Sequence, residues 1–128
     1  MKITSFNPTI VTKDAEEMVR LFEELGFERR HQSTVVDEGK TIYNYRMSDG
    51  SGFKLDVIQT SEVPQQDVVT IRMNVDDFDE AYQKLLARGF KNVNGDHVIR
   101  TDYSVSTVML APSGFAINLI HHIRKEDI

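Results

Sequence analysis

The sequence predicts an α+β fold made of two tandem βαβββ modules, and three observations support this prediction. The chain resembles itself at a fixed offset, each copy holds one amphipathic helix, and segments of alternating polar and apolar residues flank that helix. With 128 residues the chain has room for one domain, 1–128, built of two repeats at about 3–60 and 67–122.

The internal repeat is clearest in the two predicted helices. The segment DAEEMVRLFEELGF at 14–27 aligns without a gap with DFDEAYQKLLARGF at 77–90, at an offset of 77 − 14 = 63. The segment SGFKLDVIQ at 51–59 aligns with SGFAINLIH at 113–121, at an offset of 113 − 51 = 62. One residue is therefore lost across the repeat, and the polar stretch TSEVPQQD at 60–67 separates the copies.

Each copy begins with a strand-like segment, SFNPTIV at 5–11 or VVTIRMNV at 68–75. A helix follows, because apolar residues recur at helical spacing between a capping aspartate, Asp14 or Asp77, and a terminating glycine, Gly26 or Gly89. Three β-rich segments complete each copy, near 33–36, 41–47 and 53–59 in the first and near 97–101, 105–110 and 115–121 in the second.

Alternation along the strands predicts which side chains the helices cover. Leu55 and Val57 suit the helix side of the last strand, as Phe6 does in the first, and Asp56 then faces the other way. A unit of about 60 residues buries only a marginal core, so the two copies are expected to pair. Pairing creates a concave surface of mixed polarity, which suits a small organic ligand.

Composition excludes several classes of function. The chain has no cysteine, which rules out disulfides, thiolate metal sites and cysteine nucleophiles. The net charge of −5 disfavours binding to nucleic acid and to anionic membranes. The longest apolar runs are only a few residues and the start lacks a signal pattern, so we expect a cytoplasmic protein. Neither a phosphate-binding glycine loop nor a nucleophile elbow occurs.

The paired units, each with a D-x-x-E helix ending in G-F and a final S-G-F-x-[LI]-x-[LV]-I strand, resemble the vicinal oxygen chelate superfamily. This superfamily includes glyoxalase I, bleomycin-resistance proteins, fosfomycin-resistance enzymes and extradiol dioxygenases. The resemblance covers roughly 3–122 and implies a curved, incomplete mixed β-barrel with its helices outside. It also implies a homodimer, because members commonly complete their ligand sites between two subunits.

The resemblance further implies four places at which the family's enzymes hold a divalent metal with His or Glu. They correspond in this sequence to Asn7, Asp56, Thr70 and Asn118. Among these only Asp56 is a strong ligand, and catalytic zinc or iron needs about three good donors. The usual metal site is therefore predicted to be missing and no cofactor is expected, although a weak oxygen-only site for Mg²⁺ or Ca²⁺ stays conceivable.

The sequence leaves two hypotheses about the function open. The first is a metal-independent small-molecule binding protein of the bleomycin-resistance type. The second is a superfamily enzyme, a lyase, isomerase or dioxygenase, that uses a relocated metal site or acid–base chemistry by Asp56. Arg72 could either neutralise Asp56 or anchor an anionic ligand. The predicted ligand-binding residues are Asn7, Asp56, Thr70, Arg72 and Asn118, with Tyr43 and Tyr45 as a possible ligand wall.

Overall fold

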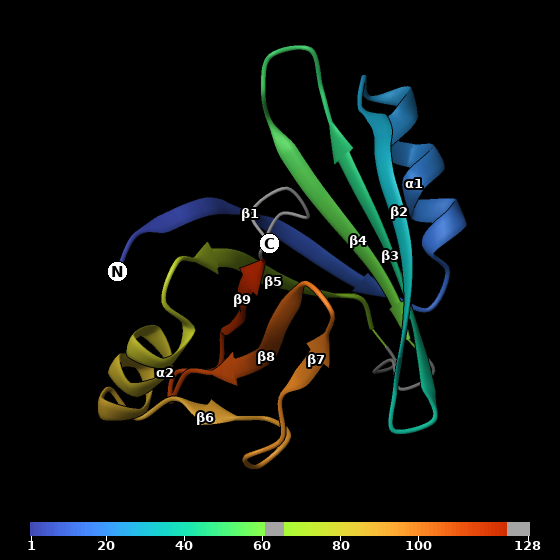
Figure 1. Cartoon of the computed structure of the whole chain (residues 1–128). Helices are drawn as coiled ribbons and strands as arrows, with labels where there is room; N and C mark the ends of the chain where they lie inside the picture. Colours follow the sequence, from blue (N-terminus) through green and yellow to red (C-terminus); the bar gives the residue numbers. More distant parts are fainter. Residues whose placement is uncertain (61–65, 123–128) are drawn as a thin grey trace. The chain divides into compact units, whose positions relative to one another are not determined.

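A computed structural model describes residues 1–60 and 66–122 of the chain (Figure 1). The predicted linker at 60–67 and the end of the chain lie largely outside the described residues. The elements in chain order are β1 (Ile3–Thr12), α1 (Ala15–Glu24), β2 (Glu28–Asp37), β3 (Lys40–Ser48), β4 (Lys54–Thr60), β5 (Val68–Val75), α2 (Phe78–Ala87), β6 (Lys91–Asn92), β7 (Ile99–Thr101), β8 (Ser104–Leu110) and β9 (Ala116–His122).

This order confirms the predicted α+β class with two βαβββ repeats. The described chain forms two compact units, which we call the N-terminal unit (Asn7–Thr70) and the C-terminal unit (Met1–Phe6 with the residues from Ile71 on). The first six residues therefore join the second repeat, a division that the linear repeat does not predict. Neither helix in the described part of the chain is long and apolar enough to cross a membrane.

The N-terminal unit is a mixed sheet with the strand order β2-β3-β4-β1. Strand β1 runs parallel to β4, and β3 runs antiparallel to both β2 and β4. Its core lies between the sheet and α1 and holds the buried side chains Ala15, Val19, Met47, Leu55 and Val57. The predicted helix side of β4 is therefore confirmed, because both of its apolar residues belong to this cluster.

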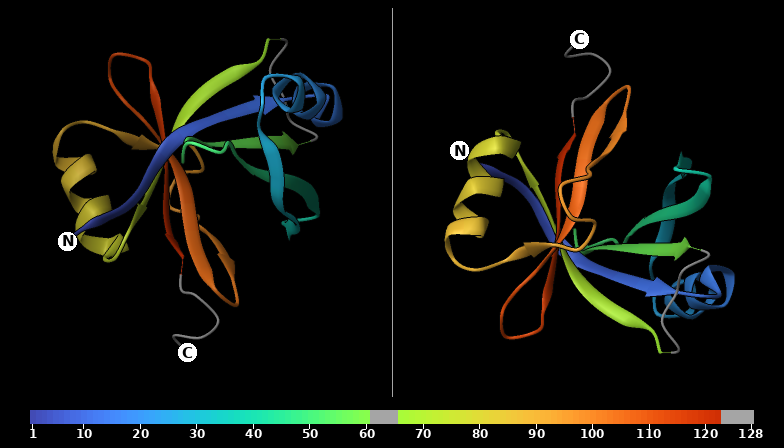
Figure 2. Two further views of the ribbon diagram at one scale, coloured as in Figure 1. Left: turned by 90° about the horizontal axis from the view of Figure 1, so that it is seen from above. Right: turned by 90° about the horizontal axis from the view of Figure 1, so that it is seen from below.

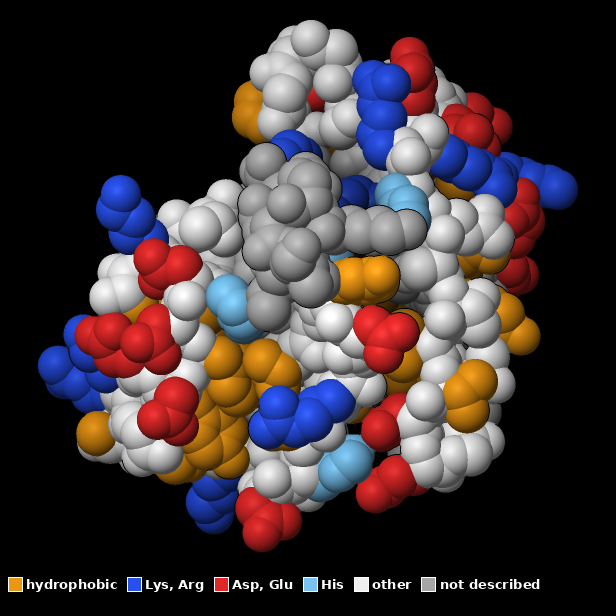
Figure 3. Space-filling model, in the orientation of Figure 1, with side chains coloured by type: hydrophobic (Ala, Val, Ile, Leu, Met, Phe, Trp, Pro, Cys, Tyr) orange, Lys and Arg blue, Asp and Glu red, His pale blue; other side chains and the backbone are white. Residues whose placement is uncertain are grey.

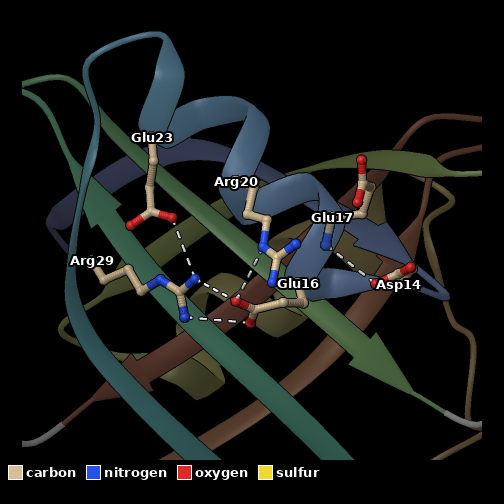
Figure 4. A network of polar contacts seen from close by, with 6 residues as sticks. All are labelled: Asp14, Glu16, Glu17, Arg20, Glu23 and Arg29. Atoms are coloured by element: carbon tan, nitrogen blue, oxygen red, sulfur yellow. Dashed lines mark hydrogen bonds and ion pairs between the residues drawn. The ribbon is translucent and has the colours of Figure 1, made fainter.

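An ion-pair network fastens α1 to β2 on the rim of this core (Figure 4). The Arg29 guanidinium donates to Glu16 Oε1 over 2.6 Å and to Glu23 Oε1 over 3.3 Å. Its Cζ atom also lies 6.0 Å from the centroid of the Tyr45 ring. The hydrogen bond from Arg29 holds the pKa of the Glu16 carboxyl below its ordinary value, and the same bond raises the pKa of Arg29.

We expect Arg29→Met to lower the free energy of unfolding, and we expect the size of this loss to depend on pH. Because the folded-state pKa of Glu16 is depressed, its stabilising contribution is present above the unfolded-state pKa and is lost as the pH falls through the folded-state pKa. The difference in unfolding free energy between wild type and variant should therefore shrink on acidification. Urea denaturation at neutral and acidic pH measures it, and a difference that grows with acid would contradict the prediction.

The C-terminal unit orders its strands as the first part of β1, then β5, β9, β8 and β6, with β7 also paired to β8. Strands β5 and β9 are parallel, and β8 is antiparallel to β9. The core faces α2, which lies on one side of these strands in both views of Figure 2. It holds the buried side chains Met73, Val75, Ala81, Met109, Ile117 and Leu119.

The chain's first residues are fixed to this unit by polar contacts. The Met1 ammonium donates to Glu80 Oε2 over 3.0 Å, and the Lys2 backbone N–H donates to Asp76 Oδ1 over 2.6 Å. The bond to Glu80 raises the pKa of the terminal ammonium and lowers that of the Glu80 carboxyl. These contacts give a local reason why 1–6 belongs with the second repeat.

Both predicted helix starts and stops are confirmed. Asp14 Oδ1 accepts a hydrogen bond from Glu17 N–H, and Asp77 Oδ1 accepts one from Glu80 N–H. Each of these bonds satisfies a backbone donor that the first turn leaves without a helical partner. Gly26 and Gly89 follow the helices with φ of +105° and +88°, a conformation that glycine adopts without strain.

The two glycines provide a matched pair of mutations. Gly26→Ala should cost about 1 kcal/mol of unfolding free energy, because its φ is unfavourable to a side chain, whereas no described atom beyond its two chain neighbours lies within 4 Å of the new Cβ. Gly89→Ala should cost about 2 kcal/mol, because its Cβ would also meet Pro112 Cγ at 3.0 Å. Chemical denaturation measures both, and equal losses would show that Pro112 yields without cost.

Two details differ from the expectations. Alternation predicts that Phe6 faces a helix, but Phe6 is 63% exposed, whereas its neighbour Asn7 is buried. The strand after the second helix, expected at 97–101, is found as the shorter β7 at 99–101, and the two-residue β6 at 91–92 precedes it, with the connection 93–98 between them. The first repeat has the unbroken ten-residue β2 at this place.

Candidate functional site

The N-terminal unit carries a buried polar cluster on the face of its sheet that points away from α1. Asp56 lies between Leu55 and Val57, which belong to the helix-side core, so its carboxylate points to the opposite face. Arg46 alternates in the same way with Tyr45 and Met47. Strand pairing then places both Thr9 of β1 and Arg46 of β3 directly beside Asp56.

Asp56 stands at the centre of this cluster and is 1% exposed. Asn7 Nδ2 donates to Asp56 Oδ1 over 3.1 Å and also to the backbone carbonyl of Pro8 over 2.9 Å. On its other side, Arg46 Nε lies 3.9 Å from Asp56 Oδ2. An amide and a guanidinium thus face the carboxylate, and both help to compensate the cost of burying its charge.

Several buried polar atoms of this cluster have no hydrogen-bond partner within the described residues. They are the Thr9 hydroxyl, the Asn44 side-chain carbonyl and the Arg46 Nε. The Thr70 hydroxyl, in the same unit, is also buried without such a partner in the described part of the chain. Buried polar groups in folded proteins are nearly always satisfied, so such atoms indicate a place for water or for a ligand.

The structure brings some of the predicted site residues together. Asn7 and Asp56 are hydrogen-bonded in the N-terminal unit. Arg72 and Asn118 are register neighbours across β5 and β9 in the C-terminal unit, where Arg72 Nη1 donates to Ser5 Oγ over 2.9 Å. Thr70 is buried.

Tyr43 and Tyr45 lie on the other face of the N-terminal sheet from Asp56. Tyr45 packs against the helix-side cluster, and Tyr43 shares its face by alternation. Tyr43 is 40% exposed. A ligand role for the two tyrosines stays a prediction, but they do not share a surface with Asp56.

Sequence reasoning did not single out Thr9, Asn44 or Arg46 as candidate ligand-binding residues. A signal for two of them was present in β3, where Asn44 and Arg46 alternate with the aromatic residues. Aromatic rings often line ligand sites, which favours the tyrosines in a reading of the sequence alone. The apolar stripe that ends at Met47 instead marks the side that packs on the helix.

The donor set does not fit the metal that enzymes of the resembled family hold. The four corresponding residues supply two amides, one hydroxyl and one carboxylate. The Asn7 side chain also points its amide nitrogen at Asp56 and donates a hydrogen bond to it. The group that Asn7 presents to the carboxylate is therefore a hydrogen-bond donor and not an oxygen that could bind a metal. Catalytic zinc or iron is held by about three imidazole, carboxylate or thiolate ligands, and this set offers one.

A family model described as the glyoxalase/bleomycin resistance protein/dioxygenase superfamily matches residues 3–119. The chain belongs to this superfamily. The match confirms the resemblance that the repeated motifs indicate, because glyoxalases, bleomycin-resistance proteins and dioxygenases are the members that those motifs suggest. Among curated proteins, none matches the chain.

Solved structures show the same fold for this superfamily member. Methylmalonyl-CoA epimerase from Mycobacterium tuberculosis superposes with a TM-score of 0.71 at 17% identity, over 97% of this chain and 91% of that one. A methylmalonyl-CoA epimerase variant from Streptomyces coelicolor, in complex with 2-nitronate-propionyl-CoA, gives 0.66 at 19% identity, over 96% and 100%. A hypothetical protein from Bacillus halodurans C-125 gives 0.70 at 11% identity, over 95% and 98%. The superpositions establish a common fold, and at identities this low they establish nothing further about this chain.

Proposed function

We propose that this protein binds a small polar organic ligand without a metal ion, on the face of the N-terminal unit that carries Asp56. The observation that carries the proposal is the set of buried polar atoms there without hydrogen-bond partners in the described chain: the Thr9 hydroxyl, the Asn44 carbonyl and the Arg46 Nε. If this core served stability alone, replacing such atoms by apolar ones would raise the free energy of unfolding, because a buried polar atom without a partner carries a desolvation cost.

The chemistry of these atoms narrows the kind of ligand. Arg46 Nε is a donor and needs an acceptor, whereas the Asn44 carbonyl is an acceptor and needs a donor. The charges of Arg46 and Asp56 face each other at 3.9 Å and offset one another. The arrangement favours a neutral molecule that presents both donors and acceptors, such as an amide or a hydroxylated carbonyl compound.

A superfamily enzyme is the competing hypothesis, and metal binding distinguishes the two. We expect the purified protein to contain no stoichiometric metal on elemental analysis. Nickel, zinc and manganese should each leave the melting temperature unchanged, since a ligand that binds only the folded state raises it with concentration. Stoichiometric metal together with a saturable rise in melting temperature would overturn the metal-free proposal and favour the enzyme.

The ligand itself can be sought with a fragment collection of neutral amides, carboxylates and amines, screened by ligand-observed NMR. We expect hits among the neutral amides, and Arg46→Met should abolish them because the aliphatic stem stays while the donor is lost. Arg30→Met is the matched control, since Arg30 is an exposed arginine of β2 in the same unit, paired with Glu28. Hits that survive Arg46→Met would argue against this face as the site.

The homodimer that the resemblance implies and the cytoplasmic location remain predictions.

A further inference from the structure

The C-terminal unit has a pocket of its own, on the side of its sheet that carries α2. Its volume is about 420 Å³, and it opens between α2 and strands β7 and β8. This volume is within the range of about 300–1,000 Å³ that is usual for small-molecule sites. In Figure 3 hydrophobic side chains gather in this region of the surface, with acidic and basic side chains beside them. The lining includes Phe78, Asp79, Tyr82, Asp96, Arg100 and Val105.

The internal repeat shows which residues of the first repeat correspond to those around this pocket. Arg29 faces Met47 across β2 and β3, and Asn92 faces Met109 across β6 and β8. The two methionines are repeat equivalents at an offset of 109 − 47 = 62, so Asn92 stands where the first repeat has Arg29. By the same comparison Asp79 is the equivalent of Glu16, at an offset of 79 − 16 = 63.

The first repeat therefore supplies its own cation to the helix-borne carboxylate, and the second does not. Arg29 donates to Glu16, whereas the amide of Asn92 is engaged by the Tyr82 hydroxyl, the His97 carbonyl and the Thr107 hydroxyl. Within the described chain the Asp79 side chain has no ion pair or hydrogen bond. In the second repeat this strand is divided into β6 and β7, and Asp79 lines the pocket together with residues of the connection between them.

The walls of the pocket suit a flat organic cation. The rings of Phe78 and Tyr82 stack at 5.8 Å with an interplanar angle of 23°, and both are half-buried. Asp79 and Asp96 are exposed, and Arg100 is the single cationic side chain of the lining, which leaves one net negative charge. Aromatic faces and carboxylates both attract cations.

The repeat also explains why the pocket has room for a ligand. Val105 stands where the first repeat has Tyr43, at an offset of 105 − 43 = 62. A smaller side chain at this position leaves space beside the stacked rings, which the tyrosine of the first repeat would fill.

We propose that this pocket binds a small monocation with a flat apolar body, whose amidinium, guanidinium or ammonium group lies beside Asp79 as Arg29 lies beside Glu16. The site does not depend on the polar cluster of the N-terminal unit. The second repeat would thus bind a cation at a position where, in the first repeat, Arg29 already pairs with the carboxylate.

Benzamidine is a suitable probe, with benzamide and benzoate as neutral and anionic molecules of nearly the same shape. In a two-dimensional NMR titration of the full chain, benzamidine should shift backbone signals of α2, β7 and β8. Benzamide and benzoate should bind at least about tenfold more weakly, because they lack the charge that Asp79 selects. Benzamidine affinity should also fall as salt is added.

Variants assign the effect to the pocket. Asp79→Asn should weaken benzamidine binding about tenfold, and this exposed substitution leaves the packed core untouched. Val105→Tyr should reduce binding by filling the space. Glu16→Gln, at the equivalent carboxylate of the first repeat, should leave the affinity unchanged. The proposal is wrong if benzamidine does not bind, if benzamide binds equally well, or if Asp79→Asn binds like wild type.

Discussion

Replacing Leu119 by alanine is expected to lower the free energy of unfolding by about 3 kcal/mol. Leu119 is 0% exposed and lies in the middle of β9, within the cluster of Met73, Val75 and Met109. Its truncation removes buried apolar area and leaves a cavity, because strands paired on both sides of β9 limit the collapse of the site. Urea denaturation followed by circular dichroism measures the loss.

Leu110→Ala is the matched control for this prediction. Leu110 lies on the neighbouring strand β8 and is 42% exposed, so its truncation should cost no more than about 0.5 kcal/mol. Equal losses at the two positions would mean that the cluster around Leu119 is not a closed core. A loss at Leu119 alone would locate the stability of the C-terminal unit beneath α2.

The second large effect is expected at Asp56, where two substitutions separate its charge from its hydrogen bond. Asp56→Ala should cost about 2–3 kcal/mol, because the buried Asn7 amide loses the oxygen to which it donates and Arg46 loses its carboxylate. Asp56→Asn keeps an oxygen for Asn7 and should cost about 1 kcal/mol or less. The Arg46 side chain is 34% exposed, so solvent screens the ion pair and the bond to Asn7 dominates.

Thermal and urea unfolding of both Asp56 variants test this ranking, and Asn118 explains why the amide is expected to be tolerated. Asn118 occupies the repeat-equivalent position in β9, at an offset of 118 − 56 = 62, so the fold already accepts an amide at such a place. Asp56→Asn should fold and should still lose the ligand of the N-terminal unit. An Asp56→Asn variant as unstable as Asp56→Ala would identify the carboxylate as a structural ion-pair partner and weaken the proposed site.

The sequence predicts the parts of the fold that depend on neighbours along the chain. The caps at Asp14 and Asp77 and the alternation of Leu55 and Val57 are local features, and the structure confirms them. The prediction for Phe6 is wrong because β1 is divided between two units, and a local pattern carries no information on that division. The broken strand of the second repeat is likewise hidden, because β6 has only two residues and so short a segment shows no alternation.

The candidate site is predicted less completely than the fold. Asn7 and Asp56 follow from the repeat and the resemblance, and they do meet. Arg46 does not follow from the repeat or the resemblance, because its position beside Asp56 depends on the register of β3 against β4. A shift by one residue would have placed Tyr45 there instead.

By itself the sequence determined the superfamily and the two βαβββ repeats, and it predicts that the usual metal ligands are missing, since each of these follows from residue types at fixed spacing. Only the tertiary structure decided that Arg46 lies beside Asp56. It also decided that Asp79 lines a pocket, whereas the equivalent Glu16 of the first repeat accepts a hydrogen bond from Arg29. The physical reason is that periodicity fixes which way a side chain points along its own strand or helix. The neighbour that it meets depends on strand pairing and helix packing between segments far apart in the chain.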